Sequence, residues 1–278
     1  MDIIHDAWDD IAEYLCYIDL FSLSIAIPHI RKYIRKDRYD VNRIILNRLS
    51  KRFGNLVDTN EFVGNLIKYN NYISGSFILQ CLYDCEWVNS DIDVYCMSED
   101  TYGKFYPDSE RFFDKYDDPE AYDAEDPLNF LKLLYKQGFK YTEAADNYEE
   151  MLLSQRMYEL NNIQINYIMV DPTPKEKSTE YTVDQWYLLG KSIHHDTIFK
   201  FVDFSFDLEF CKVVYDGQKL YIRNINSLFK RECKINLDLD KYIRRSFRGD
   251  GISDEELTVK LKKRIEKYEQ RGFTITLQ

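Results

Sequence analysis

Apolar residues along this chain recur at a helical period in some stretches and at a strand period in others. From residue 3 to about residue 50 the spacing is helix-like, with one break near residues 16–20 and another at Pro28. This pattern predicts three short amphipathic helices. The helical spacing continues over residues 40–70 in VNRIILNRLSKRF and TNEFVGNLIKYNN, with Thr59 as the expected cap of the second helix.

The period then changes around a glycine-containing turn. An apolar stretch ends in Gly75-Ser76, a short helix is expected next, and an apolar strand then carries Asp91 and Asp93. Side chains on a strand alternate between its two faces. Asp91 and Asp93 are therefore expected on one face, and the apolar residues Ile92 and Val94 on the other, in the core.

The second half of the chain mixes both periods. Pro127 is expected to open the helix LNFLKLLYKQ, which Gly138 ends, and NIQINYIMV reads as a strand. The segment KFVDFSFDLEFCKVVYDGQKLYI alternates cleanly, and Asp216-Gly217 predicts a hairpin turn within it. Its predicted apolar face holds Phe204, Phe206, Leu208 and Phe210, and its predicted polar face holds Asp203, Ser205, Asp207 and Glu209. A helix from about residue 254 to residue 270, closed by Gly272, and a final strand FTITL complete the chain.

Composition indicates a globular protein. Among 278 residues, 45% are hydrophobic and 15% aromatic, which excludes a disordered chain. No apolar run is long enough to cross a membrane, and the acidic start MDIIHDAWDD is unlike a signal peptide. We therefore expect an intracellular protein, in cytoplasm or nucleus, without a membrane partner.

The cysteines predict neither a zinc site nor a disulfide framework. The six of them lie in apolar or strand-like surroundings without a CxxC pair, and only four histidines are present. We expect reduced thiols that pack in the core.

Charge is unevenly distributed. The net charge of −11 argues against a general nucleic-acid binder, because neutralisation of phosphates drives such binding. Residues 97–126 are strongly acidic and predict a surface loop, whereas residues 31–52 and the C-terminal third are basic. A local basic groove can coexist with an acidic exterior.

The Gly-Ser turn and the two carboxylates suit the chemistry of a nucleoside triphosphate. Asp91 and Asp93 on one face repel each other unless a cation lies between them, and hard oxygen ligands suit Mg²⁺. Gly75 lets the backbone approach a phosphate, and the Ser76 hydroxyl can donate a hydrogen bond to it.

This segment resembles the signature of the polymerase-β-like nucleotidyltransferase superfamily, in the form seen in its viral and fungal members. The signature is an apolar residue, Gly and Gly or Ser, a gap, and then acid-apolar-acid-apolar, matched here by Ile73, Gly75-Ser76 and Asp91-Ile92-Asp93-Val94. The gap, residues 77–90, is slightly long. The resemblance implies an α+β fold, with a small mixed sheet flanked by helices and helical N-terminal and C-terminal parts. It also implies Mg or Mn, and transfer of a nucleoside monophosphate from NTP to an acceptor with release of pyrophosphate.

The same resemblance implies a third metal-binding acid on a later strand. Asn166 stands where several members carry an aspartate, so Asp207 is our choice as the third catalytic and metal-binding residue beside Asp91 and Asp93. Asp203 and Glu209 stay open as alternatives. A chain with none of these acids in place would bind nucleotide without turning it over. Further candidates are the surface pair His194 and His195, and, for the triphosphate, Lys191, Lys200 and Lys212.

The N-terminal pattern resembles an F-box. The residues that match are Asp9, Ile11, Leu15, Ile18, Asp19-Leu20, Leu23-Ser24, Ile27, Ile30-Arg31 and Tyr33-Ile34. The opening proline of that pattern is missing, with Ala7-Trp8 in its region. The resemblance implies docking to a Skp-type adaptor, and the alternative is a helical layer packed on the catalytic domain.

Together these features predict a helical F-box-like region over residues 1–50 and a nucleotidyltransferase-like domain over residues 51–278, with an acidic loop at about 97–127. The predicted function is nucleotidyl transfer to a protein, a small molecule or an RNA end. The alternative is an adaptor whose degenerate nucleotidyltransferase fold binds a target for ubiquitylation. A composition rich in Tyr, Ile, Asn, Lys and Asp fits an AT-rich genome such as that of a large DNA virus, which would place the protein in host cytoplasm.

Overall fold

The computed structural model describes residues 8, 10–88, 90–97, 129–144, 152–170, 198, 202, 206, 208–235 and 254–277. The α-helices are α2 (Tyr17–Ala26), α3 (Val41–Phe53), α4 (Thr59–Lys68), α5 (Ser76–Tyr83), α8 (Asn129–Lys136), α11 (Ile225–Lys230) and α13 (Asp254–Glu269). The 3₁₀ helices are η1 (Pro28–Lys32), η2 (Lys36–Tyr39) and η3 (Glu209–Cys211). The strands are β1 (Asn71–Ser74), β2 (Ile92–Met97), β3 (Lys140–Ala144), β4 (Leu152–Leu160), β5 (Ile163–Val170), β6 (Val213–Tyr215), β7 (Leu220–Ile222), β8 (Glu232–Ile235) and β9 (Thr274–Leu277).

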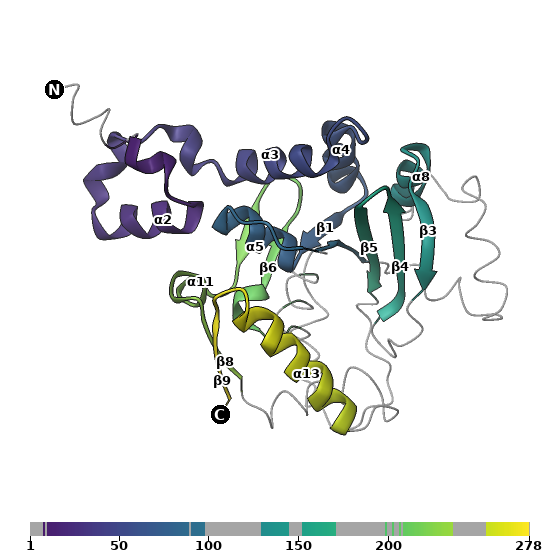
Figure 1. Ribbon diagram of the computed structural model, residues 1–278. Helices are drawn as coiled ribbons and strands as arrows, with labels where there is room; N and C mark the ends of the chain where they lie inside the picture. The colour runs from purple at the N-terminus through teal and green to yellow at the C-terminus, as the bar shows by residue number, and fades with distance from the viewer. Residues whose placement is uncertain are drawn as a thin grey trace, which may run out of the picture.

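A mixed seven-stranded sheet in the order β3-β4-β5-β2-β1-β6-β7 forms the centre of the molecule (Figure 1). The central pair β2 and β5 is parallel, and the other neighbouring pairs are antiparallel. Helices and strands thus form a mixed α+β architecture, in agreement with the predicted fold class.

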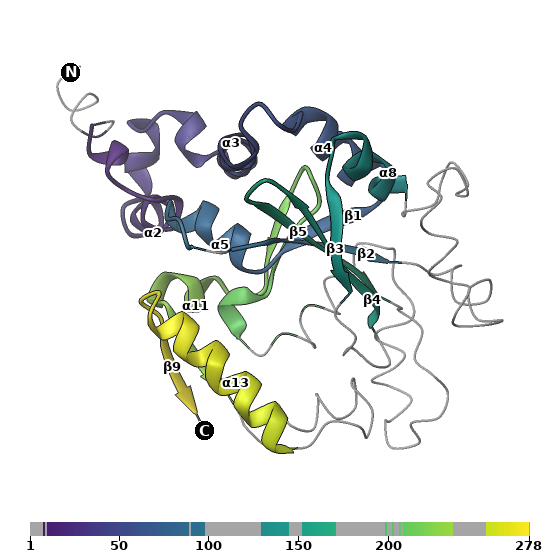
Figure 2. The ribbon, with the colours of Figure 1, turned by 45° about the vertical axis from the view of Figure 1, so that its right-hand side comes forward.

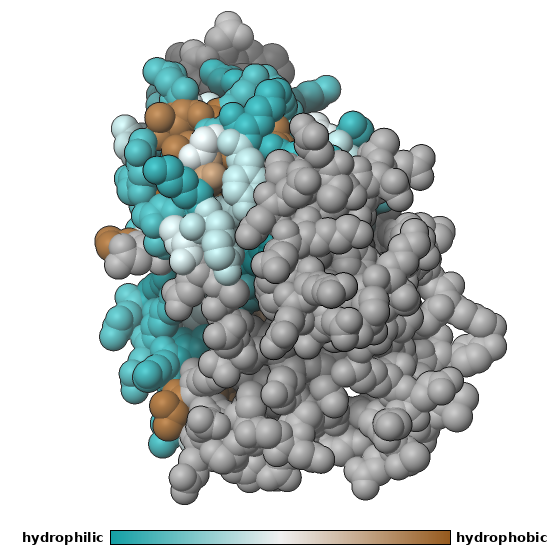
Figure 3. Space-filling model, turned by 90° about the vertical axis from the view of Figure 1, so that its right-hand side faces the viewer, coloured by the Kyte–Doolittle hydropathy of each residue, from teal (hydrophilic) through white to brown (hydrophobic). Residues whose placement is uncertain are grey.

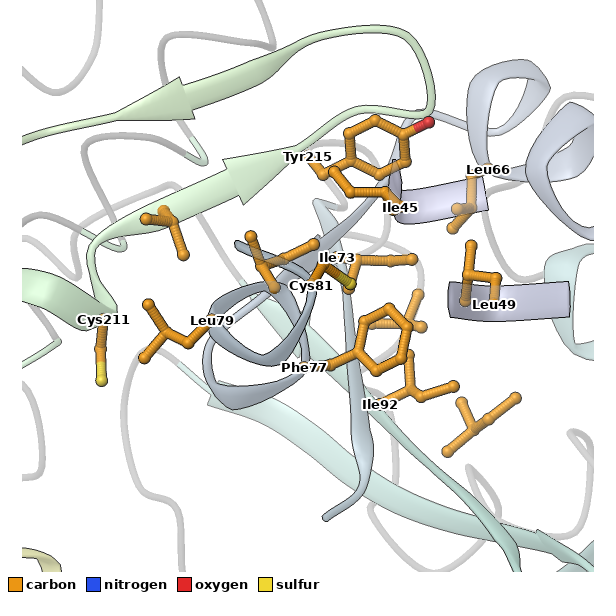
Figure 4. Packing of buried hydrophobic residues seen from close by; sticks show 14 of the residues in the cluster. Ile45, Leu49, Leu66, Ile73, Phe77, Leu79, Cys81, Ile92, Cys211 and Tyr215 are labelled. Atoms are coloured by element: carbon orange, nitrogen blue, oxygen red, sulfur yellow. The ribbon is translucent and has the colours of Figure 1, made fainter. Parts of the chain in front are cut away.

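Helices cover one face of this sheet. The apolar sides of α3, α4, α5 and α8 pack there against alternate residues of β1, β2 and β5, such as Ile73, Ile92 and Ile165. Figure 4 shows α3 residues Ile45 and Leu49 in the same cluster as Phe77 of α5. The opposite face carries a smaller apolar cluster, formed by Tyr72, Tyr95, Ile168, Val170, Ile198, Val202 and Val214.

Local sequence explains where the covering helices begin and end. The Asp40 side chain accepts a hydrogen bond from the backbone N–H of Arg43 and caps α3, and Gly54, with φ of 56°, ends it. The cap of α4 is Asp58, whose side chain accepts from the N–H groups of Asn60 and Glu61. The predicted cap, Thr59, is therefore wrong by one residue.

The C-terminal part forms a separate layer. Strands β8 and β9 pair in parallel as a second, two-stranded sheet, and α13 runs beside them on the side of the molecule away from α3 and α4 (Figures 1 and 2). An aromatic cluster joins this layer to the rest: the ring centroids of Phe273 and Phe210 lie 4.1 Å apart, and those of Phe273 and Tyr83 lie 5.5 Å apart.

The N-terminal helices hold a small core of their own. Ala12, Leu20, Ile30 and Ile34 are buried in it, whereas Ile18 of α2 belongs to the main core. Helix α3 continues through residue 50, and the division of the chain into residues 1–50 and 51–278 stays a prediction.

Several predicted elements are confirmed. The helix after the Gly-Ser turn is α5, LNFLKLLYKQ contains α8, NIQINYIMV contains β5, and the tail forms α13 and β9. The Asp216-Gly217 turn joins β6 and β7 as a hairpin, with the Asp216 carboxylate accepting from the N–H groups of Gln218 and Lys219. The predicted loop at 97–127 lies outside the described residues, apart from Met97 at the end of β2.

One predicted strand is wrong. Glu209–Cys211 forms the 3₁₀ helix η3, and the N–H of Phe206 donates to the carbonyl of Val202 as in a helical turn. Leu208 and Phe210 are both buried, as the alternation predicts. However, Leu208 lies just before η3, and Phe210 and Cys211 of the turn are both buried, so burial does not follow a strand period there; the strand begins only at Val213.

The described surface seen in Figure 3 is mostly hydrophilic, with isolated apolar side chains. None of the helices in the described ranges is long and apolar enough to cross a bilayer. All six cysteines are free thiols, and four of them are buried, as the sequence predicts.

Candidate active site

Asp91 and Asp93 lie on the sheet face opposite the main core. Ile92 and Val94 are fully buried among the residues of that core, whereas Asp91 and Asp93 are only partly buried. Because β2 alternates, Asp93 shares the opposite face with Tyr95. The predicted burial of Ile92 and Val94 and the partial exposure of Asp91 and Asp93 are confirmed, although Asp91 itself lies one residue before β2.

Gly75 places the turn after β1 directly against Asp93. Strands β1 and β2 are antiparallel with Ser74 opposite Asp93, so the end of one strand meets the start of the other. Gly75 has φ of 77°, and a Cβ built on it would lie 3.0 Å from Oδ2 of Asp93. Glycine is required there for two reasons: its positive φ, and the space that the carboxylate occupies.

Ser76 begins α5 next to this turn, and its hydroxyl is already engaged. The Oγ atoms of Ser76 and Ser90 are 3.0 Å apart, and Nε2 of Gln80 donates to Ser90 Oγ at 2.7 Å. Oε1 of Gln80 accepts from the N–H of Trp87 at 2.9 Å. The site therefore offers an incoming anion the backbone N–H groups of the first turn of α5, which have no acceptor within the helix, in addition to the Ser76 side chain.

The same hydrogen bonds fix the chain that leads into Asp91. Ser90 is buried, and its carbonyl accepts a hydrogen bond from the Arg52 side chain of α3. Gln80 and Arg52 thus hold the segment before β2 from both sides, which sets the position of the Asp91 backbone.

Asn166 lies beside Asp93 on the neighbouring parallel strand. The two residues are paired in register between β2 and β5, and Nδ2 of Asn166 donates to Oδ1 of Asp93 at 2.8 Å. Oδ1 of Asn166 is buried and has no hydrogen-bond partner among the described residues. A neutral amide with an unused acceptor therefore occupies the place next to the two carboxylates.

The electrostatics of the site favour protonation of Asp93. Burial, and next the negative charge of Asp91, raise the pKa of Asp93 to about 7. The hydrogen bond from Asn166 and the positive charges of Lys267 and Arg264 lower the pKa again, by less. Two carboxylates crowded in this way gain most from a cation bound between them.

Helix α13 supplies the cations near the carboxylates. Burial and the neighbouring Arg271 lower the pKa of the Lys267 ammonium, whereas Asp91 and Asp93 raise it. Just after the end of α13, the guanidinium carbon of Arg271 lies 4.0 Å from the ring centroid of Trp87, a contact that helps to hold the helix in place. Trp87 belongs to the segment that leads into Asp91. The Arg271–Trp87 contact therefore links the end of α13, which carries Lys267, to the segment that carries Asp91.

The structure brings together Asp91, Asp93, Gly75 and Ser76 but not the whole predicted set. Asp207, with Asp203, His194, His195, Lys191 and Lys200, lies outside the described residues. Glu209 lies in η3 rather than on a strand face, and its carboxylate pairs with Nζ of Lys212 at 2.7 Å. Within the described part of the chain, no three His, Cys, Asp or Glu side chains cluster closely enough to hold a metal ion.

Some residues of the site carry no local sequence signal. Gln80, Ser90 and Arg52 meet only through the packing of α3 on α5. Lys267 lies more than 170 residues after Asp93 in sequence, and only its spacing of three from Arg264 places the two on one side of a helix.

Comparison with known proteins gives matches among solved structures, but not among family models or curated proteins. No protein-family model and no curated protein matches the sequence. Among solved structures, a Thermotoga maritima CCA-adding enzyme complexed with tRNA matches with a TM-score of 0.43 and 15% identity, over 85% of this chain. The chain spans 42% of the length of that enzyme. A likeness of this size carries no conclusion about this protein.

Among the described residues, two carboxylates and one amide offer oxygen ligands for a divalent metal ion, one acid short of a three-carboxylate site. Asp91 and Asp93 supply hard oxygen ligands on one face, Gly75 leaves the carboxylate accessible, and the unused Oδ1 of Asn166 is a further neutral oxygen. The geometry thus combines an anion-binding helix start with a partial carboxylate site for a cation.

Proposed function

We propose that the protein transfers a nucleoside monophosphate from NTP to an acceptor and releases pyrophosphate. The observation that carries the proposal is the contact between the Gly75 turn and Asp93, with Asp91 on the same face. A phosphate at the start of α5 would lie beside the two carboxylates, which is where a metal-bound triphosphate has to sit.

In this proposal Asp91 and Asp93 hold Mg²⁺ or Mn²⁺, with Asp207 as the expected third acid. The ion would neutralise charge on the triphosphate and on the departing pyrophosphate. The backbone N–H groups at the start of α5 orient the triphosphate, and Lys267 and Arg264 of α13 add positive charge near Asp93.

The test is transfer of label from each of the four NTPs, with Mg²⁺ or Mn²⁺, to fractions of a cell lysate. We expect Asp91→Ala and Asp93→Ala each to reduce labelling by about 1000-fold or more while the fold is kept, because transition-state charge stabilisation is lost. Glu266→Ala, which removes an exposed carboxylate from α13, is the matched control and should label normally. Full labelling by the Asp91→Ala, Asp93→Ala double variant would disprove the proposal.

Asn166 provides a second prediction. Asn166→Asp adds a carboxylate next to Asp93, so we expect Mn²⁺ affinity to rise by about tenfold, measured by isothermal titration. Asn162→Asp adds the same charge at an exposed position in the turn before β5 and should leave the affinity unchanged. An equal gain in both variants would mean that general charge, not the site, binds the ion.

The labelled fraction identifies the acceptor class. A protein hydroxyl, a small molecule and an RNA end are the candidates, and the net charge of −11 disfavours long RNA.

A second candidate is a binding role for the N-terminal helices, as in an F-box-type adaptor that presents a target for ubiquitylation. It is favoured by the separate small core of this region and by apolar side chains exposed on it, with Tyr14 89% exposed and Ile25 53% exposed. Purified Skp-type adaptor should then bind the chain and lose binding in Tyr14→Asp, Ile25→Asp. Absence of binding to the unmodified chain would exclude this role.

A further inference from the structure

A pocket lies at the end of α5 away from Gly75. Its volume is about 400 Å³, and its floor includes Cys81 and Asp84 from the last turn of that helix and the residue after it. One wall is the side of α3 that carries Ile44, Asn47, Arg48 and Lys51, and the other comes from the N-terminal helices, with Leu15, Cys16, Tyr17, Leu20, Arg35, Asp37 and Arg38.

This pocket gathers positive charge in an acidic protein. The chain has a net charge of −11, yet cations outnumber carboxylates in the lining, which holds only Asp37 and Asp84 of the acidic type. The cations are Arg35, Arg38, Arg43, Arg48 and Lys51, all from the basic segment of residues 31–52. Such a local reversal of charge favours an anionic ligand.

Two of the carboxylates that balance these cations are exposed, whereas Asp37, 26% exposed, is held by both Arg35 and Arg43. Arg48 is largely buried, with 11% of its side chain exposed, and pairs with Asp84 at 2.6 Å and Glu86 at 3.2 Å. Those two carboxylates are 81% and 64% exposed. Exposed ion pairs contribute little stability, so a ligand anion can replace the carboxylates while the buried guanidinium stays paired.

Arg38 adds a donor that the described protein does not satisfy. One of its terminal nitrogens pairs with Glu13 at 3.2 Å, whereas its Nε is buried and has no hydrogen-bond partner among the described residues. A buried N–H without an acceptor is costly, and a ligand oxygen in the pocket would remove that cost.

We propose that this pocket binds a phosphate-bearing small molecule of up to nucleotide size. Guanidinium groups match phosphate oxygens in pairs, and the volume falls within the range of about 300–1,000 Å³ that is usual for ligand pockets. The apolar wall of Leu15, Tyr17 and Leu20 receives the part of the ligand that carries no charge. The proposal does not depend on Asp91 and Asp93.

The test is isothermal titration of the full chain with pyrophosphate and with AMP, in EDTA so that no metal-dependent site contributes. We expect Arg43→Ala, Lys51→Ala to weaken binding of both probes by about tenfold or more, because two charge-assisted contacts are lost. Both side chains are exposed, at 55% and 69%, so the fold should be kept, which thermal denaturation would check. Lys136→Ala is the control: it removes a similarly exposed lysine of α8, 72% exposed, that pairs with Glu61 of α4, away from the pocket.

The outcomes separate this pocket from the proposed active site. Binding that is unchanged in Asp91→Ala and lost in the Arg43, Lys51 variant supports the proposal. No heat of binding at millimolar probe, or equal binding by the pocket variant and the unmodified chain, overturns it. The proposal is also overturned if a single-stranded RNA oligonucleotide displaces AMP and binds more tightly than AMP does, because the basic surface would then be a nucleic-acid-binding surface.

Discussion

Ionisation of the Asp93 carboxylate is electrostatically unfavourable in the folded protein. The carboxylate is held by a hydrogen bond from Asn166 and crowded by Asp91, and its pKa is raised from the ordinary 3.8 to about 7. In the metal-free protein an ionised Asp93 therefore opposes folding, and the same repulsion favours a bound cation.

The raised pKa of Asp93 predicts that the free energy of unfolding depends on pH. The folded chain binds a proton at Asp93 more tightly than the unfolded chain, so the free energy of unfolding falls as pH rises from about 4 to about 7 and then levels off. Asp93→Asn removes this decline, and we expect that variant to be more stable than the unmodified chain by about 2 kcal/mol at pH 8 in EDTA. Urea unfolding at a series of pH values measures the difference. Parallel curves for the two proteins would show that Asp93 titrates normally.

At the scale of elements, a single glycine, Gly75, meets two structural requirements of the turn between β1 and α5. It reverses the chain at a positive φ, and it leaves room for the Asp93 carboxylate, which an added Cβ would approach to 3.0 Å. The antiparallel pairing of β1 with β2 makes this contact unavoidable.

We expect Gly75→Ala to lower the free energy of unfolding by about 1–2 kcal/mol, because alanine is strained at this φ and displaces the carboxylate. The variant should also lose Mn²⁺ affinity. Gly64→Ala is the control: it lies in α4 with open space around it, and alanine there should stabilise the helix by up to about 1 kcal/mol. Thermal and urea unfolding of both variants measures whether the free energy of unfolding falls in Gly75→Ala and rises in Gly64→Ala. Equal decreases in the two variants would contradict the requirement for glycine at position 75.

At the scale of the whole molecule, the C-terminal layer is coupled to the site through aromatic packing. Phe273 is 4% exposed, and its ring lies near those of Phe210, Tyr83 and Trp87. Trp87 in turn carries Arg271 of the segment after α13 on its face. Loss of this packing would release the helix that brings Lys267 to the carboxylates.

Phe273→Ala should therefore destabilise the protein by about 3 kcal/mol through a cavity in this cluster, and should raise the KM for NTP if transfer is observed. Leu277→Ala, at the end of the strand β9 that follows Phe273 but 48% exposed, should cost less than about 0.5 kcal/mol. Denaturant unfolding of the two variants distinguishes them. A loss from Phe273→Ala no larger than that from Leu277→Ala would mean that the layer is not coupled to the core.

Most elements could be predicted from local pattern, and the failures have physical causes. Strong caps and turn residues, such as Gly138 and Asp216-Gly217, marked the ends of α8 and of β6 correctly. Strand β4 was not predicted, because polar residues such as Arg156 are buried on it and obscure the alternation. Strand β8 is short and pairs with β9 across 38 residues of sequence, so its existence depends on that distant partner.

The sequence by itself determined the turn at Gly75 and the shared face of Asp91 and Asp93, because these depend on backbone geometry and a period of two, and the resemblance of its motif implied the mixed α+β class. The tertiary structure alone decided that Asn166 lies against Asp93, that Ser76 pairs with Ser90, and that α13 brings Lys267 towards the carboxylates. Strand register and helix packing between distant segments set those contacts, and no local spacing encodes them. The same is true of the arginine-lined pocket, whose two walls meet only after α3 packs on the N-terminal helices.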